Sequence, residues 1–234
     1  MSIKLNIKRF QSGKSYEESF EVKRVKTLLE ALFEIRESQD SSLTFASNCR
    51  SGICGECSVR VNDKEQLSCG FKLEDGKTYN IEPLRYHTPE RDLVVDKSVV
   101  AKKLQDSRAY LEDYKPQTLT PADERLTQIQ SDCILCSSCF SSCPVFEVNS
   151  DFLGPFALSR VYRYLSDKRE KSLQKVELIQ QNGVWDCTLC GECSSVCPQG
   201  LSPKDDILNL RGKSLQAGFS DPNFTSLDFG FGGF

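Results

Sequence analysis

The chain has 234 residues, 38% hydrophobic and 27% charged, enough to form two ordinary domains. A formal net charge of −3, without a clustered cationic surface, argues against a nucleic acid partner. No apolar run approaches the roughly 18–20 residues of a membrane-spanning helix, and the N-terminus leads into a strand pattern instead of a secretory signal.

Alternating apolar residues open the chain and predict a half-buried strand over Ile3–Ile7, with a return strand at Ser19–Val25. The run from Thr27 to Glu30 has the pattern of a capping box, in which two side chains satisfy free backbone N–H groups at the start of a helix. We therefore expect a helix from Thr27 onward, with its apolar face in the core.

A group of four cysteines follows, at Cys49, Cys54, Cys57 and Cys69. The C-x4-C-x2-C run with a distant fourth cysteine is the plant-type [2Fe–2S] spacing. Gly52 and Gly55 fit this interpretation, because glycine permits the sharp turns that bring backbone N–H groups close to sulfur. Together with the flanking strands and the helix, the pattern predicts a β-grasp ferredoxin domain over residues 1–105.

The second half carries helical patterns and predicts an all-helical, bacterial-type two-cluster ferredoxin domain over residues 106–217, within an α+β protein. Glu112–Leu119 connects the halves, and Thr120 followed by Pro121 marks a helix start. Other helices are predicted at Asp96–Leu111, Pro155–Lys168, Ser172–Asn182 and from Ser202 onward.

The motif C-x2-C-x2-C-x3-C-P occurs twice in this half. Its cysteines are Cys133, Cys136, Cys139 and Cys143, and then Cys187, Cys190, Cys193 and Cys197. In the bacterial iron–sulfur signature, the fourth cysteine of each motif binds the other cluster, so the ligand sets cross. The predicted sets are Cys133, Cys136, Cys139 and Cys197 around one cluster, and Cys143, Cys187, Cys190 and Cys193 around the other.

Zinc sites and disulfides are the alternatives for these cysteines. Zinc also binds four thiolates, but three cysteines at three-residue steps and a fourth before a proline fit zinc poorly. Disulfides are rare in reducing compartments. The twelve cysteines form three sets of four with none left over, which favours metal binding.

Three further features carry weaker signals. His87, the only histidine, cannot supply the paired imidazoles of a Rieske centre and is predicted to be an ordinary surface or interface residue, with a proton-handling role as the alternative. Trp185 is expected to pack beside a cluster. The tail Gly218–Phe234 mixes five phenylalanines with Gly, Ser and Asp, which predicts disorder in isolation and allows the hypothesis that it docks on a partner subunit.

In order and spacing, these motifs resemble the iron–sulfur subunit of succinate dehydrogenases and fumarate reductases, from about Ile3 to Leu215. The segments Asp92–Asp96, Cys133–Cys136 and Cys197–Leu201 also carry the resemblance. It implies a subunit that transfers electrons between an FAD-containing flavoprotein, where succinate and fumarate interconvert, and a membrane-associated, quinone-linked subunit. It also implies that the [2Fe–2S] cluster lies nearest the flavin.

Two departures from the usual family pattern stand out. Usual members lack a cysteine at the position of Cys190 and hold [3Fe–4S] there, so Cys190 predicts a second [4Fe–4S], with [3Fe–4S] as the alternative. Positions that usually line a quinone pocket hold Glu147, Val148 and Thr188. Both departures resemble the unconventional branch of the family, whose third subunit is cysteine-rich and similar to part of heterodisulfide reductase.

No nucleophile–base pair, dinucleotide motif or P-loop indicates a substrate-converting site on this chain. The implied location is peripheral on the cytoplasmic membrane, with the cytoplasmic face favoured and the periplasmic face open if a signal-bearing partner exports the chain. Two rival functions are a subunit of a thiol-linked fumarate reductase or heterodisulfide-reductase-like complex, and a free-standing ferredoxin carrier.

Overall fold

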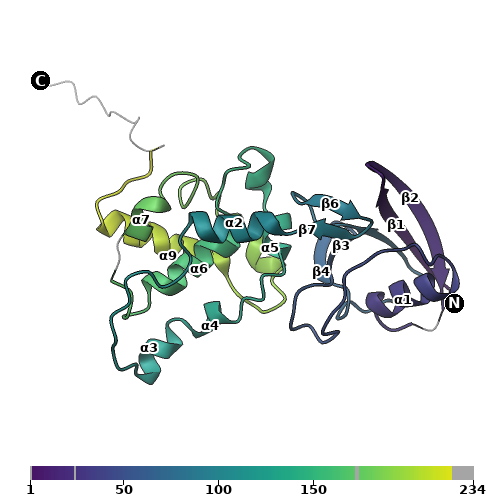
Figure 1. Cartoon of the computed structure of the whole chain (residues 1–234), viewed down its shortest axis with the longest axis horizontal. Coiled ribbons are helices and arrows are strands. Elements are labelled where there is room, and N and C mark those ends of the chain that lie inside the picture. Colours follow the sequence, from purple (N-terminus) through teal and green to yellow (C-terminus); the bar gives the residue numbers. More distant parts are fainter. Residues whose placement is uncertain (1, 24, 172–173, 223–234) are drawn as a thin grey trace, which may run out of the picture.

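The computed structural model describes residues 2–23, 25–171 and 174–222. A strand-rich half and a helical half lie end to end along the longest axis of the molecule (Figure 1). Each half has its own cluster of buried hydrophobic residues. Within the described residues, each half therefore has a core of its own, as the length and composition of the chain predict.

A five-stranded mixed sheet forms the first half, in the order β2-β1-β5-β3-β4. Its strands are β1 (Ile3–Gln11), β2 (Lys14–Val22), β3 (Ser58–Val61), β4 (Lys64–Leu67) and β5 (Thr78–Glu82). β1 runs parallel to β5, and the other pairs are antiparallel. A short antiparallel ribbon of β6 (Thr88–Arg91) and β7 (Val94–Asp96) follows the sheet.

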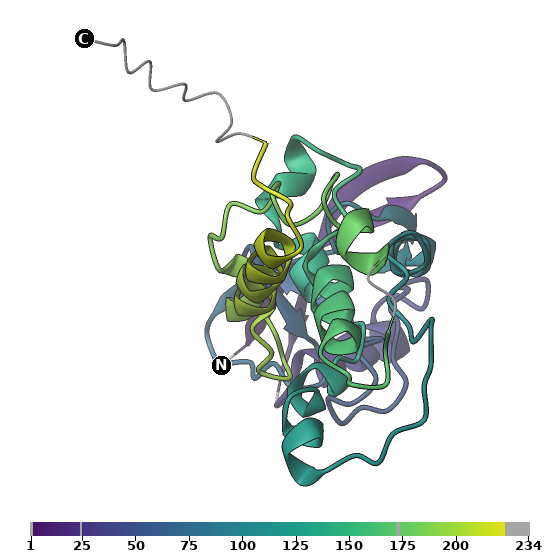
Figure 2. The ribbon, with the colours of Figure 1, turned by 90° about the vertical axis from the view of Figure 1, so that its left-hand side faces the viewer.

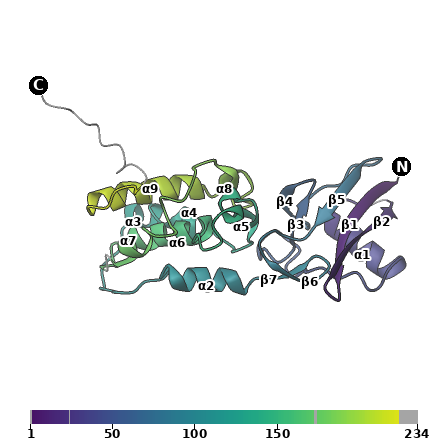
Figure 3. The same cartoon turned by 90° about the horizontal axis from the view of Figure 1, so that it is seen from above.

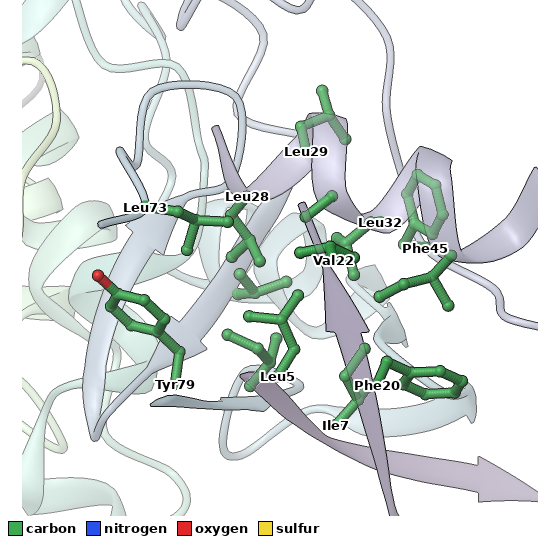
Figure 4. Packing of buried hydrophobic residues seen from close by; sticks show 14 of the residues in the cluster. Leu5, Ile7, Phe20, Val22, Leu28, Leu29, Leu32, Phe45, Leu73 and Tyr79 are labelled. Carbon is green, nitrogen blue, oxygen red and sulfur yellow. The ribbon is translucent and has the colours of Figure 1, made fainter. Parts of the chain in front are cut away.

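One helix, α1 (Leu28–Ser38), packs on this sheet. Its capping box is formed as predicted: the Thr27 side chain accepts a hydrogen bond from the Glu30 N–H, and the Glu30 carboxylate accepts one from the Thr27 N–H. Leu28 and Leu32 of the helix are fully buried and face the side chains of the two longest strands, which include Leu5 (Figure 4). The predicted amphipathic helix and alternating strand are thus confirmed.

A buried ion-pair network ties this domain to the segment before its cysteine loop. Arg9 is only 1% exposed; its Nη1 lies 2.6 Å from Asp40 Oδ2, and its Nε lies 2.9 Å from Asp92 Oδ1. Hydrogen bonds from Ser42 and Arg9 lower the pKa of Asp40 to about 2. Asp92 also accepts a hydrogen bond of 2.8 Å from the Thr44 N–H. The network therefore holds the chain over residues 40–44, shortly before Cys49.

Replacing Arg9 with Met should destabilise the first domain by about 3–5 kcal/mol, because it leaves the buried Asp92 carboxylate without its cation. Chemical unfolding followed by far-UV circular dichroism measures the loss. Lys8→Met on the same strand is the matched control: Lys8 is 45% exposed and pairs with Glu82, so it should cost less than about 1 kcal/mol. Equal losses in the two variants would contradict the assigned role of Arg9.

The second half consists mainly of helices. They are α2 (Ser98–Asp106), α3 (Pro121–Arg125), α4 (Gln128–Ser131), α5 (Ser138–Ser141), the 3₁₀ helix η1 (Pro144–Glu147), α6 (Pro155–Leu165), α7 (Gln174–Leu178), α8 (Glu192–Ser195) and α9 (Pro203–Gln216). α6 and α9 pack side by side (Figure 2). α2 leads out of β7 along one edge of the helical half and contacts α6 (Figure 3).

The helix predictions for this half hold in part. Thr120 caps α3 and Pro121 opens it, as expected, and α9 begins after Ser202. Of the predicted helix at Ser172–Asn182, residues 172 and 173 lie outside the described part of the chain, and the rest forms the helix α7 only as far as Leu178. The helix predicted at Asp96–Leu111 is formed only as α2. An isolated antiparallel bridge pairs Tyr114 with Glu170, so the expectation of an all-helical domain is not confirmed.

A buried carboxyl group holds three helices of this half together. Asp206 of α9 is 5% exposed and accepts hydrogen bonds from Gln130 Nε2 of α4, at 2.8 Å, and from the Ser159 hydroxyl of α6. Burial raises the pKa of Asp206 above its ordinary value. Since Ser159 also lines the cavity described below, this junction supports the wall of a cysteine site.

No helix within residues 2–23, 25–171 and 174–222 is long and apolar enough to cross a membrane.

Val100 of α2 belongs to the buried cluster of the helical half. The division at residue 105 stays a prediction, as does the role of the tail, of which residues 223–234 lie outside the described part of the chain.

Candidate metal centres

The first cysteine loop directs its backbone N–H groups at one sulfur. Cys49 Sγ accepts hydrogen bonds from the N–H groups of Ser51, Ile53 and Cys54, at 3.4, 3.4 and 3.3 Å. The Ser51 N–H makes the largest contribution to lowering the pKa of Cys49, to about 6. Gly52, in the same loop, has a φ of +74°, a left-handed conformation that costs glycine little. The expected approach of N–H groups to sulfur is thus confirmed for this loop.

A hairpin brings the other two cysteines of this set together. Cys57 directly precedes β3 and Cys69 follows β4, and the Ser68 N–H donates a 3.0 Å hydrogen bond to the Cys57 carbonyl. Burial, and then the Cys57 thiol, raise the pKa of Cys69 to about 11. The charge of the Cys49 thiol also raises the pKa of Cys69. The loop and the hairpin therefore bring their thiols together in one group.

The two repeated motifs of the second half fold in the same way. In each, the residue before the second cysteine and the residue after it are left-handed: Leu135 and Ser137 in the first motif, Leu189 and Gly191 in the second. A four-residue helix then begins and carries the third cysteine, which is α5 in one motif and α8 in the other. The fourth cysteine follows this helix. The two motifs have the same spacing in the sequence, and they also have the same backbone geometry at these positions.

The crossed ligand set of the second centre surrounds a single cavity. Its walls include the four predicted cysteines. The other lining residues are mostly apolar, among them Leu135, Phe156 and Leu201. Burial raises the pKa of Cys136, and it raises that of Cys139 well above its ordinary range. Four soft donors around an apolar cavity fit a [4Fe–4S] cluster.

The third set of cysteines gathers beside the second. Burial raises the pKa of Cys143 to about 11 and that of Cys193 to about 12, and the thiols of Cys187 and Cys190 contribute to both increases. The Leu189 N–H donates a 3.4 Å hydrogen bond to Cys187 Sγ, which repeats the N–H···S geometry of the first loop. Cys190 is the one exposed cysteine of the twelve, so this set reaches the protein surface.

Contacts between the sets arrange them in a row. A Cβ atom added at Gly55 of the first loop would lie 2.7 Å from the Cβ of Cys136, so the first and second sets touch through the backbone. The pKa of Cys139 is raised by burial and also by the nearby thiol of Cys193, which belongs to the third set. The second set therefore lies between the other two.

The state of the thiols bears on the disulfide alternative. All twelve cysteines lie in the described residues, and each of them is a free thiol. Across the described part of the chain, no group of three or more His, Cys, Asp or Glu side chains converges on a single metal ion. The choice between zinc and iron–sulfur clusters therefore comes from the motifs and from the comparisons given below.

Several neighbours of the thiols were not predicted from the sequence. Ser138 Oγ lies 3.4 Å from Cys136 Sγ, and Arg211 donates a 2.6 Å hydrogen bond to the Cys187 carbonyl. Gln199 donates a 2.9 Å hydrogen bond to the Gly52 carbonyl, 147 positions away in the sequence. No signal in the sequence predicted the last contact, because the partner of Gln199 is set by how the halves dock.

Both His87 and Trp185 pack against other side chains in the structure. The His87 ring is 8% exposed, packs 4.8 Å from the Phe140 ring of the helical half, and places Nδ1 3.0 Å from the Asp96 carbonyl. Burial lowers the pKa of His87. Its buried position between the halves agrees with the interface alternative, and the surface alternative is wrong. Trp185 donates a hydrogen bond to Gln180 and packs against the helical core, as expected of a residue beside a cysteine site.

Two protein-family models match the chain. Residues 4–102 match the 2Fe-2S iron-sulfur cluster binding domain, and residues 129–201 match the 4Fe-4S dicluster domain. These matches and the three thiol groups define an iron–sulfur protein with two ferredoxin-type domains. The sequence analysis predicted this domain order.

Comparison with named relatives identifies the family of this chain. The 8-methylmenaquinol:fumarate reductase iron-sulfur subunit of Wolinella succinogenes is 34% identical over 237 residues, which span 93% of this chain and 74% of the relative. The chain belongs to the family of fumarate reductase and succinate dehydrogenase iron–sulfur subunits.

Two other comparisons add detail. One subunit of the CoM/CoB fumarate reductase of Methanothermobacter marburgensis is 32% identical over 92% of this chain, which spans only 45% of that relative. A chain of the Mycobacterium smegmatis Sdh1 complex in the apo form superimposes with a TM-score of 0.83 at 21% identity, covering 94% of this chain and 98% of that one. The match to the chain of the Sdh1 complex shows that the two chains share a fold.

Replacing Gly55 with Ala should lower the iron content of both the first and the second centre, because the new Cβ would collide with the backbone of Cys136. Gly52→Ala is a matched control: Gly52 has the same φ of +74°, but nothing lies within 4 Å of its added Cβ. Both variants carry the left-handed strain of about 1–2 kcal/mol, so only the collision distinguishes them.

Iron and acid-labile sulfide, measured on anaerobically purified protein, report the difference. We expect Gly52→Ala to keep nearly all its iron and Gly55→Ala to lose a large part. Equal iron content in the two variants would show that the contact between Gly55 and Cys136 has no role in assembly.

Proposed function

We propose that this chain is the electron-transfer iron–sulfur subunit of a quinone-linked fumarate reductase or succinate dehydrogenase complex. In this role it relays single electrons between an FAD-containing flavoprotein and a membrane-associated, quinone-linked subunit. The observation that carries the proposal is the row of three thiol groups in a chain that is 34% identical to a menaquinol:fumarate reductase iron-sulfur subunit. Substrate conversion belongs to the flavoprotein.

The positions of the thiols support the predicted ligand sets. Cys49, Cys54, Cys57 and Cys69 would hold [2Fe–2S]. Cys133, Cys136, Cys139 and Cys197 would hold [4Fe–4S], and Cys143, Cys187, Cys190 and Cys193 would hold the third cluster. When bound, such clusters supply one-electron redox chemistry over a wide range of potentials.

The protein supplies position and surroundings. Its N–H groups donate to sulfur at Cys49 and Cys187, which stabilises negative charge on the thiolates. Apolar side chains such as Phe156 and Leu201 exclude water from the second site. The contact of Gly55 with Cys136 keeps the first two sites at a short, fixed separation.

Cys190 makes the third site a complete set of four thiols, so we propose [4Fe–4S] there and not [3Fe–4S]. Native protein should then hold about ten iron atoms, counted as two, four and four. Cys190→Ser should remove one iron and produce the signal of an oxidised [3Fe–4S] cluster in electron paramagnetic resonance. A native, oxygen-protected sample that already shows this signal would contradict the assignment.

The location and the domain limits are parts of the same proposal. The complex would lie on the cytoplasmic membrane, held there by other subunits, with the cytoplasmic face favoured. Residues 1–105 and 106–217 would form the two ferredoxin domains, and residues 218–234 would form the tail. Exposed Cys190 would place the third site near the acceptor subunit.

A second candidate has specific support. The match to one subunit of a CoM/CoB fumarate reductase spans 92% of this chain at 32% identity. A thiol-linked fumarate reductase or heterodisulfide-reductase-like complex is therefore the alternative partner set. In that case electrons would come from a pair of thiols and not from a quinol.

Anaerobic purification through a tag on this chain tests the proposal. We expect a flavin-containing subunit to co-purify, and the complex to reduce fumarate with a menaquinol analogue and not with a coenzyme thiol pair. Activity with thiols alone would favour the alternative. Recovery of a cluster-loaded monomer without flavin would favour a free-standing ferredoxin carrier.

A further inference from the structure

The side chain of Gln199 crosses from the second centre to the first. Gln199 lies two residues after Cys197 and lines the cavity formed by the second cysteine set. Its Nε2 donates a 2.9 Å hydrogen bond to the carbonyl of Gly52, in the middle of the first cysteine loop. One half-buried side chain thus touches the walls of two sites in different domains.

The carbonyl that accepts this bond belongs to a peptide unit that also faces sulfur. The Gly52 carbonyl and the Ile53 N–H are the two ends of one peptide group, and that N–H donates to Cys49 Sγ at 3.4 Å. The chain of bonds therefore runs from the Gln199 amide through this peptide to the Cys49 sulfur. Hydrogen bonds in series polarise one another, so a donor on the carbonyl strengthens the N–H on the other side.

Side-chain packing around the Gly52–Ile53 peptide is slight. Gly52 itself is left-handed, and nothing lies within 4 Å of a Cβ added there. Ile53 is 69% exposed, so its side chain adds little packing to hold the peptide in place. The contact from Gln199 therefore orients the peptide.

We propose that Gln199 is a positioning residue for the first centre, which orients and polarises the Gly52–Ile53 peptide toward the Cys49 sulfur from the opposite domain. The inference rests on the proposed function, because it takes the Cys49 set as the [2Fe–2S] site. N–H···S bonds stabilise the more negative, reduced form of a cluster. Docking of the domains thereby raises the reduction potential of the first centre.

The test replaces Gln199 with Leu, which keeps a similar size and removes the donor. Asn is a second, milder variant, because its amide is one methylene shorter and falls short of the Gly52 carbonyl. Gln105→Leu, at an exposed position on α2, is the matched control. All variants are purified anaerobically as the complete complex.

Redox titration monitored by electron paramagnetic resonance gives the potential of each centre. For Gln199→Leu and Gln199→Asn we expect the first centre to shift to a more negative potential, by up to a tenfold change in its reduction equilibrium, about 59 mV for one electron. The second centre, whose cavity Gln199 also lines, should shift less than the first. Gln105→Leu should match the wild type.

Hydrogen exchange of the same samples, followed by mass spectrometry, is the second readout. The peptide that contains Ile53 should exchange about tenfold faster in the Gln199 variants, as the loss of one hydrogen bond predicts. Unchanged potential of the first centre in both fully loaded variants would overturn the inference, even if stability fell. Wild-type protein that lacks the [2Fe–2S] signal would instead overturn the proposed function.

Discussion

A loop that surrounds an iron–sulfur cluster must turn back on itself while its N–H groups face the sulfurs, and left-handed residues meet this demand in all three cysteine loops. Glycine takes the position without strain at Gly52 and Gly191. Leu135 and Leu189 take it at a cost of about 1–2 kcal/mol each, at matched places in the two repeated motifs. Strain placed twice at the same point indicates that the loop geometry has a function.

The interface between the halves depends on these loops as much as on side-chain packing. Gly55 meets Cys136 through its backbone, and Gln199 bonds to the loop carbonyl nearby. On another side, Ser141 donates to the buried carboxylate of Glu65 at 2.7 Å. Cysteine loops and domain contacts thus share residues, so a change in docking changes the surroundings of the proposed clusters.

Burial also changes the protonation of the thiols, which links cluster binding to folding. Without metal, burial raises the pKa of six of the twelve, which favours their neutral form. A metal cluster needs thiolates, so its binding must release protons and adds its own free energy to that of folding. Cluster binding therefore also stabilises the apolar wall of the second site. This coupling fits a chain with two modest hydrophobic cores.

The sequence by itself determined the elements whose causes are local. The capping box at Thr27, the helix start at Thr120 and the twelve cysteines with their spacing depend on neighbours within a few residues, and the structure has the first two where they were expected. The short helix α7 in place of the longer one predicted shows that periodicity alone does not settle where a helix ends.

Only the tertiary structure decided which distant groups meet. The contact of Gly55 with Cys136 and the bond from Gln199 to Gly52 both join residues that lie far apart in the chain. Both pairs follow from how two separately formed cores dock. Local propensity carries no record of that docking, because its energy comes from surfaces that exist only once both halves have folded.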